Sequence, residues 1–166
     1  ETRTALLNAF QEMGAEIDII NKFGEFEPRA DLRVKFSKLK GINLDTKLVP
    51  NLIDELPAFF VAAAMSSGST TVRDAEELRH KESDRLEAMG DVLRSLGVDF
   101  NMYQDGMDIN GLDKNNAHSS YTGGIIESFG DHRIAMSSAI ACSLYDQESL
   151  VLNTDNVNTS FPTFLK

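Results

Sequence analysis

Cysteine, tryptophan and proline are scarce in this sequence, with one, none and four residues in a chain of 166. The single cysteine, Cys142, cannot form an internal disulfide, which fits a reducing compartment. With one cysteine and three histidines, a zinc site has little support, and we expect no metal in the protein. No apolar run approaches the ~18 residues that cross a bilayer, so we expect no membrane partner.

Positive charge is also in short supply. The chain carries 16 Lys and Arg against 26 Asp and Glu, a net charge of −10. This balance argues against nucleic acid as a main partner, because phosphate backbones require a basic face. It does not exclude a small anionic ligand, whose binding depends on where the cations cluster. What is present is an ordinary globular composition, with 42% hydrophobic residues and a length that suits one compact domain.

A layout of helix, glycine and strand occurs twice. In residues 6–20 and 89–102, an amphipathic helix ends at a glycine, Gly14 or Gly97, and an alternating segment follows. Glycine commonly ends a helix, and alternation of apolar and polar residues indicates a strand. Each segment is then followed by a polar turn and more extended chain.

A second pair of segments repeats a helix followed by a strand. Residues 54–77 predict a helix that begins at Pro57, a favoured first helical position, and then a Thr/Val-rich strand. Residues 131–156 repeat that order. The sequence therefore predicts an α+β fold built from repeated strand–helix–strand–helix–strand–strand units. The chain is about two such units long, and we interpret it as a piece of a larger protein. The alternative is that helix–glycine–strand similarity is common among α/β proteins.

The stretch "HKESDRLEAM", residues 80–89, places charges where a helix should face the core. On helical spacing, Glu82 falls in the middle of the apolar stripe, with Arg85 and Lys81 to one side. Either the helix starts after Glu82 with Ser83 as N-cap, or Glu82 points inward at the start of the helix. Both alternatives put a carboxylate beside two cations at the edge of a core.

Cations at the start of a helix oppose the helix dipole at a cost of about 0.3–1 kcal/mol each. A bound anion removes that cost, because the dipole, the free N–H groups and the cations then all attract it. The stretch "GDHRIAM" repeats this arrangement, with Asp131 as the expected N-cap and His132 and Arg133 in the turn that follows. We therefore predict a site for a multiply charged anion that carries phosphate or carboxylate groups.

The alternative is that the cations in both turns simply pair with nearby acids such as Glu82, Asp84 and Asp131. A further acid, Asp54, lies just before the helix that Pro57 begins. Asp54 could stabilise the first turn, or it could act as a general base, because desolvation raises the proton affinity of a carboxylate.

These stretches resemble the 5-enolpyruvylshikimate-3-phosphate (EPSP) synthase family, the 3-phosphoshikimate 1-carboxyvinyltransferases. The resemblance covers essentially the whole chain and is carried by "LVPNLIDELPAFFVAAA", "RDAEELRHKESDRLEAMGDVLRSLGV", "GDHRIAMSSAIA" and "SFPTF". The Lys-Glu-Ser-Asp-Arg run together with Asp-His-Arg is specific. A related enolpyruvyl transferase family that acts on UDP-N-acetylglucosamine shares the fold but lacks this run.

The resemblance implies a fold and an activity. Family members have two domains, each made of three βαβαββ units around a pseudo-threefold axis, and residues 1–166 match the larger part of the C-terminal domain as a single partial domain with about two of the three units. The family transfers the carboxyvinyl group of phosphoenolpyruvate to the 5-hydroxyl of shikimate 3-phosphate, in the biosynthesis of chorismate and aromatic amino acids. No cofactor is implied. The implied partners are the two anionic substrates and the N-terminal domain, in the bacterial cytoplasm.

The resemblance also implies three catalytic residues. Asp54 matches the aspartate that binds the shikimate hydroxyls and accepts a proton. Lys81 matches the lysine shared between the two substrates. Glu82 matches the acid that passes a proton to and from the methylene carbon of phosphoenolpyruvate.

Three further residues match the family's substrate-binding positions. Arg85 and Arg133 correspond to arginines that hold phosphoenolpyruvate, and His132 lines the same site. The sequence departs from the family at His80, where an aliphatic residue is usual, and at Thr159, where many members have a lysine. We assign no substrate contact to Thr159. The rival expectation is a non-catalytic, anion-binding or interaction module of the same fold.

Overall fold

The computed structural model of the chain describes residues 4–112 and 121–166. The helices are α1 (Ala5–Glu12), α2 (Leu56–Ala64), α3 (Arg85–Ser95), α5 (His132–Cys142) and α6 (Asp155–Ser160). The strands are β1 (Glu16–Phe23), β2 (Arg29–Lys35), β3 (Ser69–Val72), β4 (Asp99–Tyr103), β5 (Gly106–Asn110), β6 (Gly124–Glu127) and β7 (Ser149–Leu152). Short 3-10 turns cover Thr46–Asn51, Ile53–Glu55 and Glu76–His80. Within the described ranges, no helix combines the length and the apolar character that crossing a membrane requires.

The expected internal repeat is present. α1 is followed by the antiparallel pair β1 and β2, as α3 is followed by the antiparallel pair β4 and β5. Both helices end beside a glycine in the left-handed region, Gly14 with φ +94° and Gly97 with φ +74°, as the sequence predicts. The helix-then-strand pairs α2–β3 and α5–β7 also match. The architecture is therefore α+β and made of repeated units.

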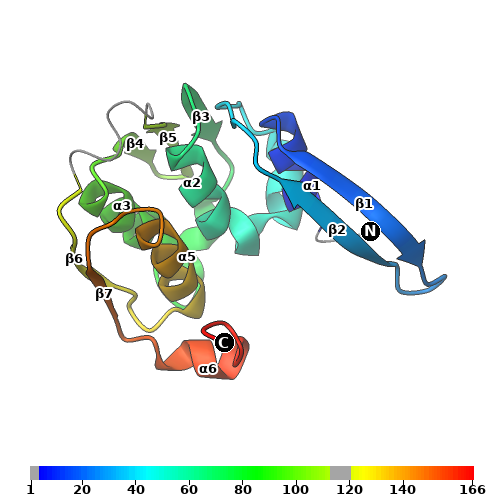
Figure 1. Cartoon of the computed structure of the whole chain (residues 1–166). Helices are drawn as coiled ribbons and strands as arrows, with labels where there is room; N and C mark the ends of the chain where they lie inside the picture. The colour runs from blue at the N-terminus through cyan, green and yellow to red at the C-terminus, as the bar shows by residue number, and fades with distance from the viewer. Residues whose placement is uncertain (1–3, 113–120) are drawn as a thin grey trace.

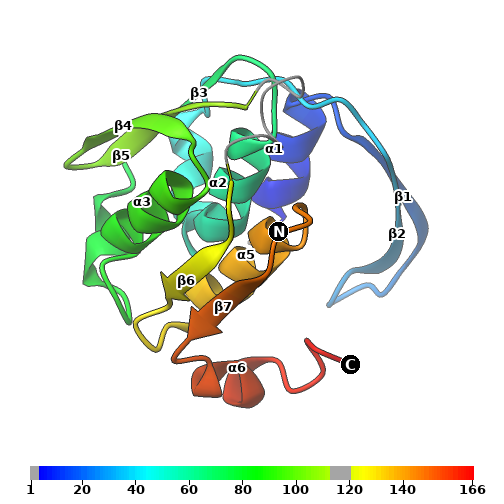
Figure 2. The ribbon, with the colours of Figure 1, turned by 60° about the vertical axis from the view of Figure 1, so that its left-hand side comes forward.

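The strands form three small sheets, in the orders β1–β2, β3–β5–β4 and β6–β7. β6 and β7 are parallel and joined through α5. Residues 40–43 run parallel to residues 67–71 in the same way, with α2 between them, but only as isolated bridges rather than as a full strand. The ladder is interrupted near Gly68, whose φ of +82° turns the partner segment out of extended conformation. In Figures 1 and 2, α5 packs against the β6–β7 sheet and α2 against the β3–β5–β4 sheet.

The core forms around α2. Its sequence, "LPAFFVAAA", is apolar on every face, and seven of its nine residues are buried. A helix that is apolar all round is stable only when it is surrounded by other elements. Phe59 and Phe60 are fully buried, and α2 contacts α3, α5 and β5. This central helix fixes where the ends of its neighbours lie.

Apolar surface is exposed at several places in the described part of the chain. One is the β1–β2 hairpin, which projects from the body of the chain in Figure 1 and, with the residue after it, exposes Phe23, Val34 and Phe36 by 59%, 65% and 82%. Another is a groove of about 540 Å³ between α2 and α5, whose lining includes the aromatic side chains of Phe10 and Phe161. Contiguous apolar surface of this kind marks a place where another element packs.

A buried ion pair joins α3 to α5. The Arg85 side chain is 1% exposed and the Asp131 side chain 0%, and Nε of Arg85 donates to Oδ2 of Asp131 over 2.8 Å. Burial by itself raises the pKa of the Asp131 carboxyl, but hydrogen bonds from Arg85, the Arg133 backbone N–H and Ser83 outweigh it. The pKa therefore lies below its ordinary value of 3.8.

We expect Asp131 to contribute stability that is present above its ordinary pKa and lost as the pH falls through its lowered pKa in the folded chain. At neutral pH, Asp131→Asn should lower the free energy of unfolding by about 3–5 kcal/mol, because it removes the one fully buried carboxylate of the three that pair with the buried Arg85 guanidinium. The difference in the free energy of unfolding between the wild type and Asp131→Asn should narrow below about pH 4. Denaturant unfolding of the two proteins at successive pH values measures it.

The matched control is Asp91→Asn, which removes an exposed partner of Arg94 on the outer face of α3 and should cost less than about 1 kcal/mol. A gap between wild type and Asp131→Asn that stays constant from neutral pH down to pH 2 would contradict the lowered pKa.

Candidate functional site

The start of α3 differs from both sequence-based alternatives. The N-cap is Asp84, whose side chain accepts from the Glu87 backbone N–H, so the expectation of Ser83 as N-cap is wrong. Glu82 precedes the helix and its side chain is 54% exposed, so it does not point into the core either. The helix starts one residue later than a Ser83 cap would give. The Asp84 carboxylate also accepts a hydrogen bond from the Arg79 guanidinium over 2.8 Å, which favours Asp84 as the cap.

The start of α5 is as the sequence predicts. Asp131 is its N-cap and accepts from the backbone N–H groups of Arg133 and Ile134, at 2.9 and 3.5 Å. A carboxylate here satisfies free N–H groups and faces the positive end of the helix dipole. The same carboxylate also binds Arg85, so α5 and the first turn of α3 are positioned by one side chain.

Arg85 lies at the centre of the site. Its guanidinium contacts three carboxylates: Nε donates to Asp131 over 2.8 Å, Nη1 to Asp54 over 3.2 Å and Nη2 to Glu82 over 2.5 Å. A planar guanidinium can bind several acceptors in fixed directions, which a lysine cannot do. Each of the three guanidinium nitrogens of Arg85 thus donates to a carboxylate, which compensates for the burial of the charge.

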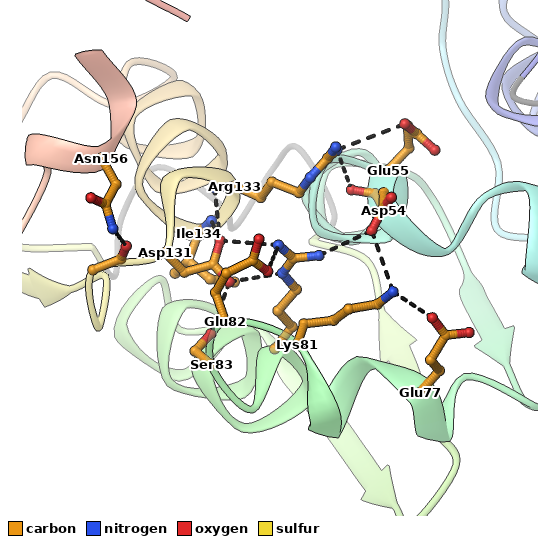
Figure 3. A network of polar contacts seen from close by, with 12 residues as sticks. Asp54, Glu55, Glu77, Lys81, Glu82, Ser83, Asp131, Arg133, Ile134 and Asn156 are labelled. Carbon is orange, nitrogen blue, oxygen red and sulfur yellow. Dashed lines mark hydrogen bonds and ion pairs between the residues drawn. The ribbon is translucent and has the colours of Figure 1, made fainter. Parts of the chain in front are cut away.

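The other two cations converge on Asp54 (Figure 3). Nζ of Lys81 lies 3.7 Å from Oδ1 of Asp54, and Nη1 of Arg133 donates to the Asp54 backbone oxygen over 2.6 Å. The three cations come from the segment before α3, from α3 itself and from α5, and they share one region. The sequence prediction that these charges gather beside two acids thus agrees with the geometry.

The alternative of local pairing is also partly correct, because the cations have acidic partners. Glu82 and Asp131 bind Arg85 as that alternative expects, whereas Asp84 binds Arg79 instead. Two partners were not anticipated from the sequence. Glu77 pairs with Lys81, and Glu55 lies 3.7 Å from Arg133. The Glu77 pairing was detectable, since it has the i,i+4 spacing of neighbours on a helix.

Among the described residues, the side chains at the remaining positions named from the sequence make no hydrogen bond or ion pair with this network. His132 is the first residue of α5, and within the described ranges its side chain has no recorded hydrogen bond or ion pair, unlike the side chains in Figure 3. Thr159 is exposed in α6, and His80 is exposed at the end of its 3-10 turn. The histidine at position 80 therefore occupies no core position.

Chemically, the cluster offers cations for an anion and carboxylates for proton transfer. Three cations face five carboxylates (Asp54, Glu55, Glu77, Glu82 and Asp131), an excess of two negative charges. Glu77 and Glu82 are 62% and 54% exposed, so these acids can move when an anion takes their place. In residues 4–112 and 121–166, no group of three or more His, Cys, Asp and Glu side chains has the arrangement of a metal site.

Solved structures with the same arrangement of elements are known. The EPSP synthase from Acinetobacter baumannii superimposes with a TM-score of 0.91 and is 42% identical, over 98% of this chain and 37% of that one. A second structure of EPSP synthase from the same organism gives a TM-score of 0.88 at 39% identity, again over 98% and 37% of the two chains.

Curated relatives agree with the structures. A 3-phosphoshikimate 1-carboxyvinyltransferase of Legionella pneumophila (strain Lens) is 47% identical over 99% of this chain, and one of Xanthomonas euvesicatoria pv. vesicatoria is 50% identical over 98%. This chain spans 36% of the length of each. The family model described as EPSP synthase (3-phosphoshikimate 1-carboxyvinyltransferase) matches residues 2–166. The chain therefore belongs to the EPSP synthase family.

Proposed function

We propose that the protein to which this chain belongs transfers the carboxyvinyl group of phosphoenolpyruvate to the 5-hydroxyl of shikimate 3-phosphate and releases phosphate. The observation that carries the proposal is the convergence of Lys81, Arg85 and Arg133 on Asp54, with Glu82 bound to Arg85. Both substrates are anions, which suits this group of cations. The relatives named above are bacterial proteins, and we place the reaction in the bacterial cytoplasm.

The chain supplies only part of the catalytic machinery in this proposal. It forms a single partial domain, residues 1–166, the larger part of the C-terminal domain. Two of its exposed apolar surfaces, the hairpin and the groove between α2 and α5, are places where the rest of that domain packs. The excess of carboxylates over cations means that further positive charge comes from the N-terminal domain, across the site. This half alone therefore binds the substrates weakly and has no turnover.

The cations hold the substrates in the proposed complex. Arg85 and Arg133 bind the phosphate and carboxylate groups of phosphoenolpyruvate, and Lys81 lies between the two substrates. Arg133 is 29% exposed and paired with Glu55, so an incoming anion can replace that acid as its partner. His132 lines the same site from the first position of α5. Charge-assisted hydrogen bonds of this kind are the strong ones.

The acids transfer the protons. The oxygen of the 5-hydroxyl attacks the central carbon of phosphoenolpyruvate while Asp54 accepts the proton of that hydroxyl. Glu82 donates a proton to the methylene carbon. The resulting tetrahedral intermediate loses phosphate when Glu82 takes a proton back from the new methyl group. The Glu82 side chain is partly exposed, and its contact with Arg85 places it beside a cation that holds phosphoenolpyruvate in this proposal, so the same carboxyl group can reach the methylene carbon in both steps.

The proposal is tested by replacing the matching segment of the Acinetobacter baumannii EPSP synthase with these 166 residues. The chimera should release phosphate from phosphoenolpyruvate when shikimate 3-phosphate is present, whereas the 166-residue chain alone should release none. A chimera that folds cooperatively and binds both substrates without turnover would instead favour a non-catalytic anion-binding module. A folded chimera that binds neither substrate would contradict both functions.

In the chimera, Glu82→Gln should lower kcat by about 100- to 10,000-fold, because the amide cannot give and take a proton. Substrate binding should persist, since the amide keeps the size of the side chain. Steady-state phosphate release and calorimetric binding separate the two effects. Glu12→Gln, an exposed change near the end of α1, is the matched control and should leave both unchanged. Unaltered kcat in Glu82→Gln would remove this carboxylate from the mechanism.

Arg133→Ala should raise the KM for phosphoenolpyruvate by about 10- to 150-fold, the loss of one or two hydrogen bonds between charged groups. The KM for shikimate 3-phosphate should change less, because Lys81 and Asp54 stay in place. Arg94→Ala removes an exposed arginine that pairs with Asp91 and lies over the Phe100 ring, away from the proposed site, and serves as control. Equal KM values for phosphoenolpyruvate in the two variants would argue against a binding role for Arg133.

A further inference from the structure

The turn that carries Lys81 and Glu82, residues 81–84, lies between the 3-10 turn Glu76–His80 and the start of α3. Within the described ranges, residues 81–83 make no backbone–backbone hydrogen bond, whereas the Asp84 oxygen accepts from the Ala88 N–H over 2.9 Å. A segment without such bonds is held only by side chains, or it is not held at all. The position of two proposed catalytic residues therefore depends on side-chain contacts around this turn.

Arg79 provides the strongest of these contacts. Its side chain is only 14% exposed, and its guanidinium donates to the backbone oxygens of Gln104 and Tyr103, over 2.8 and 2.9 Å. The same group donates to Oδ2 of Asp84 over 2.8 Å. Arg79 thus links the turn between β4 and β5 to the residue just before α3, and it spans residues 81–84 from one end to the other.

The far end of the turn is fixed through Asp84 and Ser83. While Oδ2 of Asp84 binds Arg79, its Oδ1 accepts from the Glu87 backbone N–H over 3.1 Å and caps α3. The Ser83 hydroxyl donates to Oδ2 of Asp131 over 3.1 Å, a contact visible in Figure 3. Lys81 and Glu82 are therefore flanked on both sides by anchored residues, and Arg79 is the anchor that reaches across the whole turn.

We propose that Arg79 is a positioning residue of the reaction, and that it holds the turn 81–84 so that Lys81 and Glu82 face Asp54 and Arg85. This inference rests on the proposed function. The planar guanidinium of Arg79 binds two carbonyls and the carboxylates of Asp84 and Glu87, in directions that a lysine ammonium cannot reproduce. Its partners lie outside the cluster of Asp54, Glu82 and Asp131, so Arg79 touches neither substrate. Displacing a catalytic group by about 1 Å costs on the order of 100-fold in rate.

The test compares Arg79→Lys with Arg94→Lys in the chimera. Arg79→Lys should lower kcat by about 10- to 100-fold while the KM for phosphoenolpyruvate stays within about threefold, because Arg85 and Arg133 are held by Asp131 and α5 rather than by the turn. Arg94→Lys removes the same guanidinium from an exposed pair and should leave kcat unchanged. A kcat within about twofold of the parent in Arg79→Lys, or a loss confined to thermal stability, overturns the proposal.

A second variant tests the link through Asp84. Asp84→Asn keeps a good helix cap but weakens the bond to Arg79, so it should lower kcat in the same direction. Because the contact that Asp84→Asn weakens is one of those that Arg79→Lys also disrupts, the double variant Arg79→Lys, Asp84→Asn should lose little more than the worse single variant. Fully additive losses would show that Arg79 does not act through this contact.

A readout that does not depend on activity separates this proposal from the proposed function. Backbone amide order parameters, measured by NMR on the 166-residue chain, should fall at Lys81, Glu82 and Ser83 in Arg79→Lys and stay unchanged in Arg94→Lys. If the parent chimera is inactive, the proposed function fails and the order parameters alone decide whether Arg79 holds the turn. Unchanged order parameters at residues 81–83 contradict the role of Arg79 in either case.

Discussion

The arrangement of the site depends on one buried ion pair, Arg85 with Asp131. Asp131 is the N-cap of α5 and accepts a hydrogen bond from the Arg133 backbone N–H. The same carboxylate accepts a hydrogen bond from the guanidinium of Arg85, the first residue of α3. Removing Arg85 would leave the buried Asp131 carboxylate without a cation, and removing Asp131 would take from Arg85 the one partner that is fully buried with it. The first turns of the two helices are therefore fixed relative to each other, and Asp54 and Glu82 take their positions from Arg85.

This dependence explains why cations can occupy positions that the helix dipole disfavours. At the start of each helix, a carboxylate is present to compensate: Asp84 caps α3 and Asp131 caps α5. Arg85 is nevertheless fully buried, which requires three acidic partners rather than one. The resulting site is pre-organised and rich in carboxylates before any ligand arrives. In the proposed function, an anion that enters the site replaces the exposed acids Glu77 and Glu82, while the buried pair stays intact.

Much of the fold follows from local signals in the sequence. Gly14 and Gly97 mark helix ends because only glycine adopts the left-handed backbone there without strain, and Asp131 is recognisable as a cap from its position before an apolar run. The internal repeat follows from these same signals. The start of α3 was misjudged, since Asp84 is selected as cap by a contact with Arg79 that helical spacing does not reveal.

The site itself was only half predictable, because its residue types are local but its contacts are not. Lys81, Glu82 and Arg85 stand close together in the sequence, so their proximity could be expected. That Asp131 and Asp54 meet the same guanidinium depends on how α3 packs between α2 and α5, and no short-range pattern encodes that packing. The role of Glu55 as a partner of Arg133 could be identified only once α5 was placed beside the segment before α2, whereas the pairing of Glu77 with Lys81 follows from their i,i+4 spacing.

The separation of Arg85 and Asp131 along the chain, 46 residues, has a consequence for synthesis on the ribosome. Translation proceeds from the N-terminus, so Asp54, Glu82 and Arg85 emerge first, and Asp131 follows after a few seconds at about 5–20 residues per second. During that interval the guanidinium lacks the one partner that is fully buried with it. The charged cluster is therefore complete only once the start of α5 has been made.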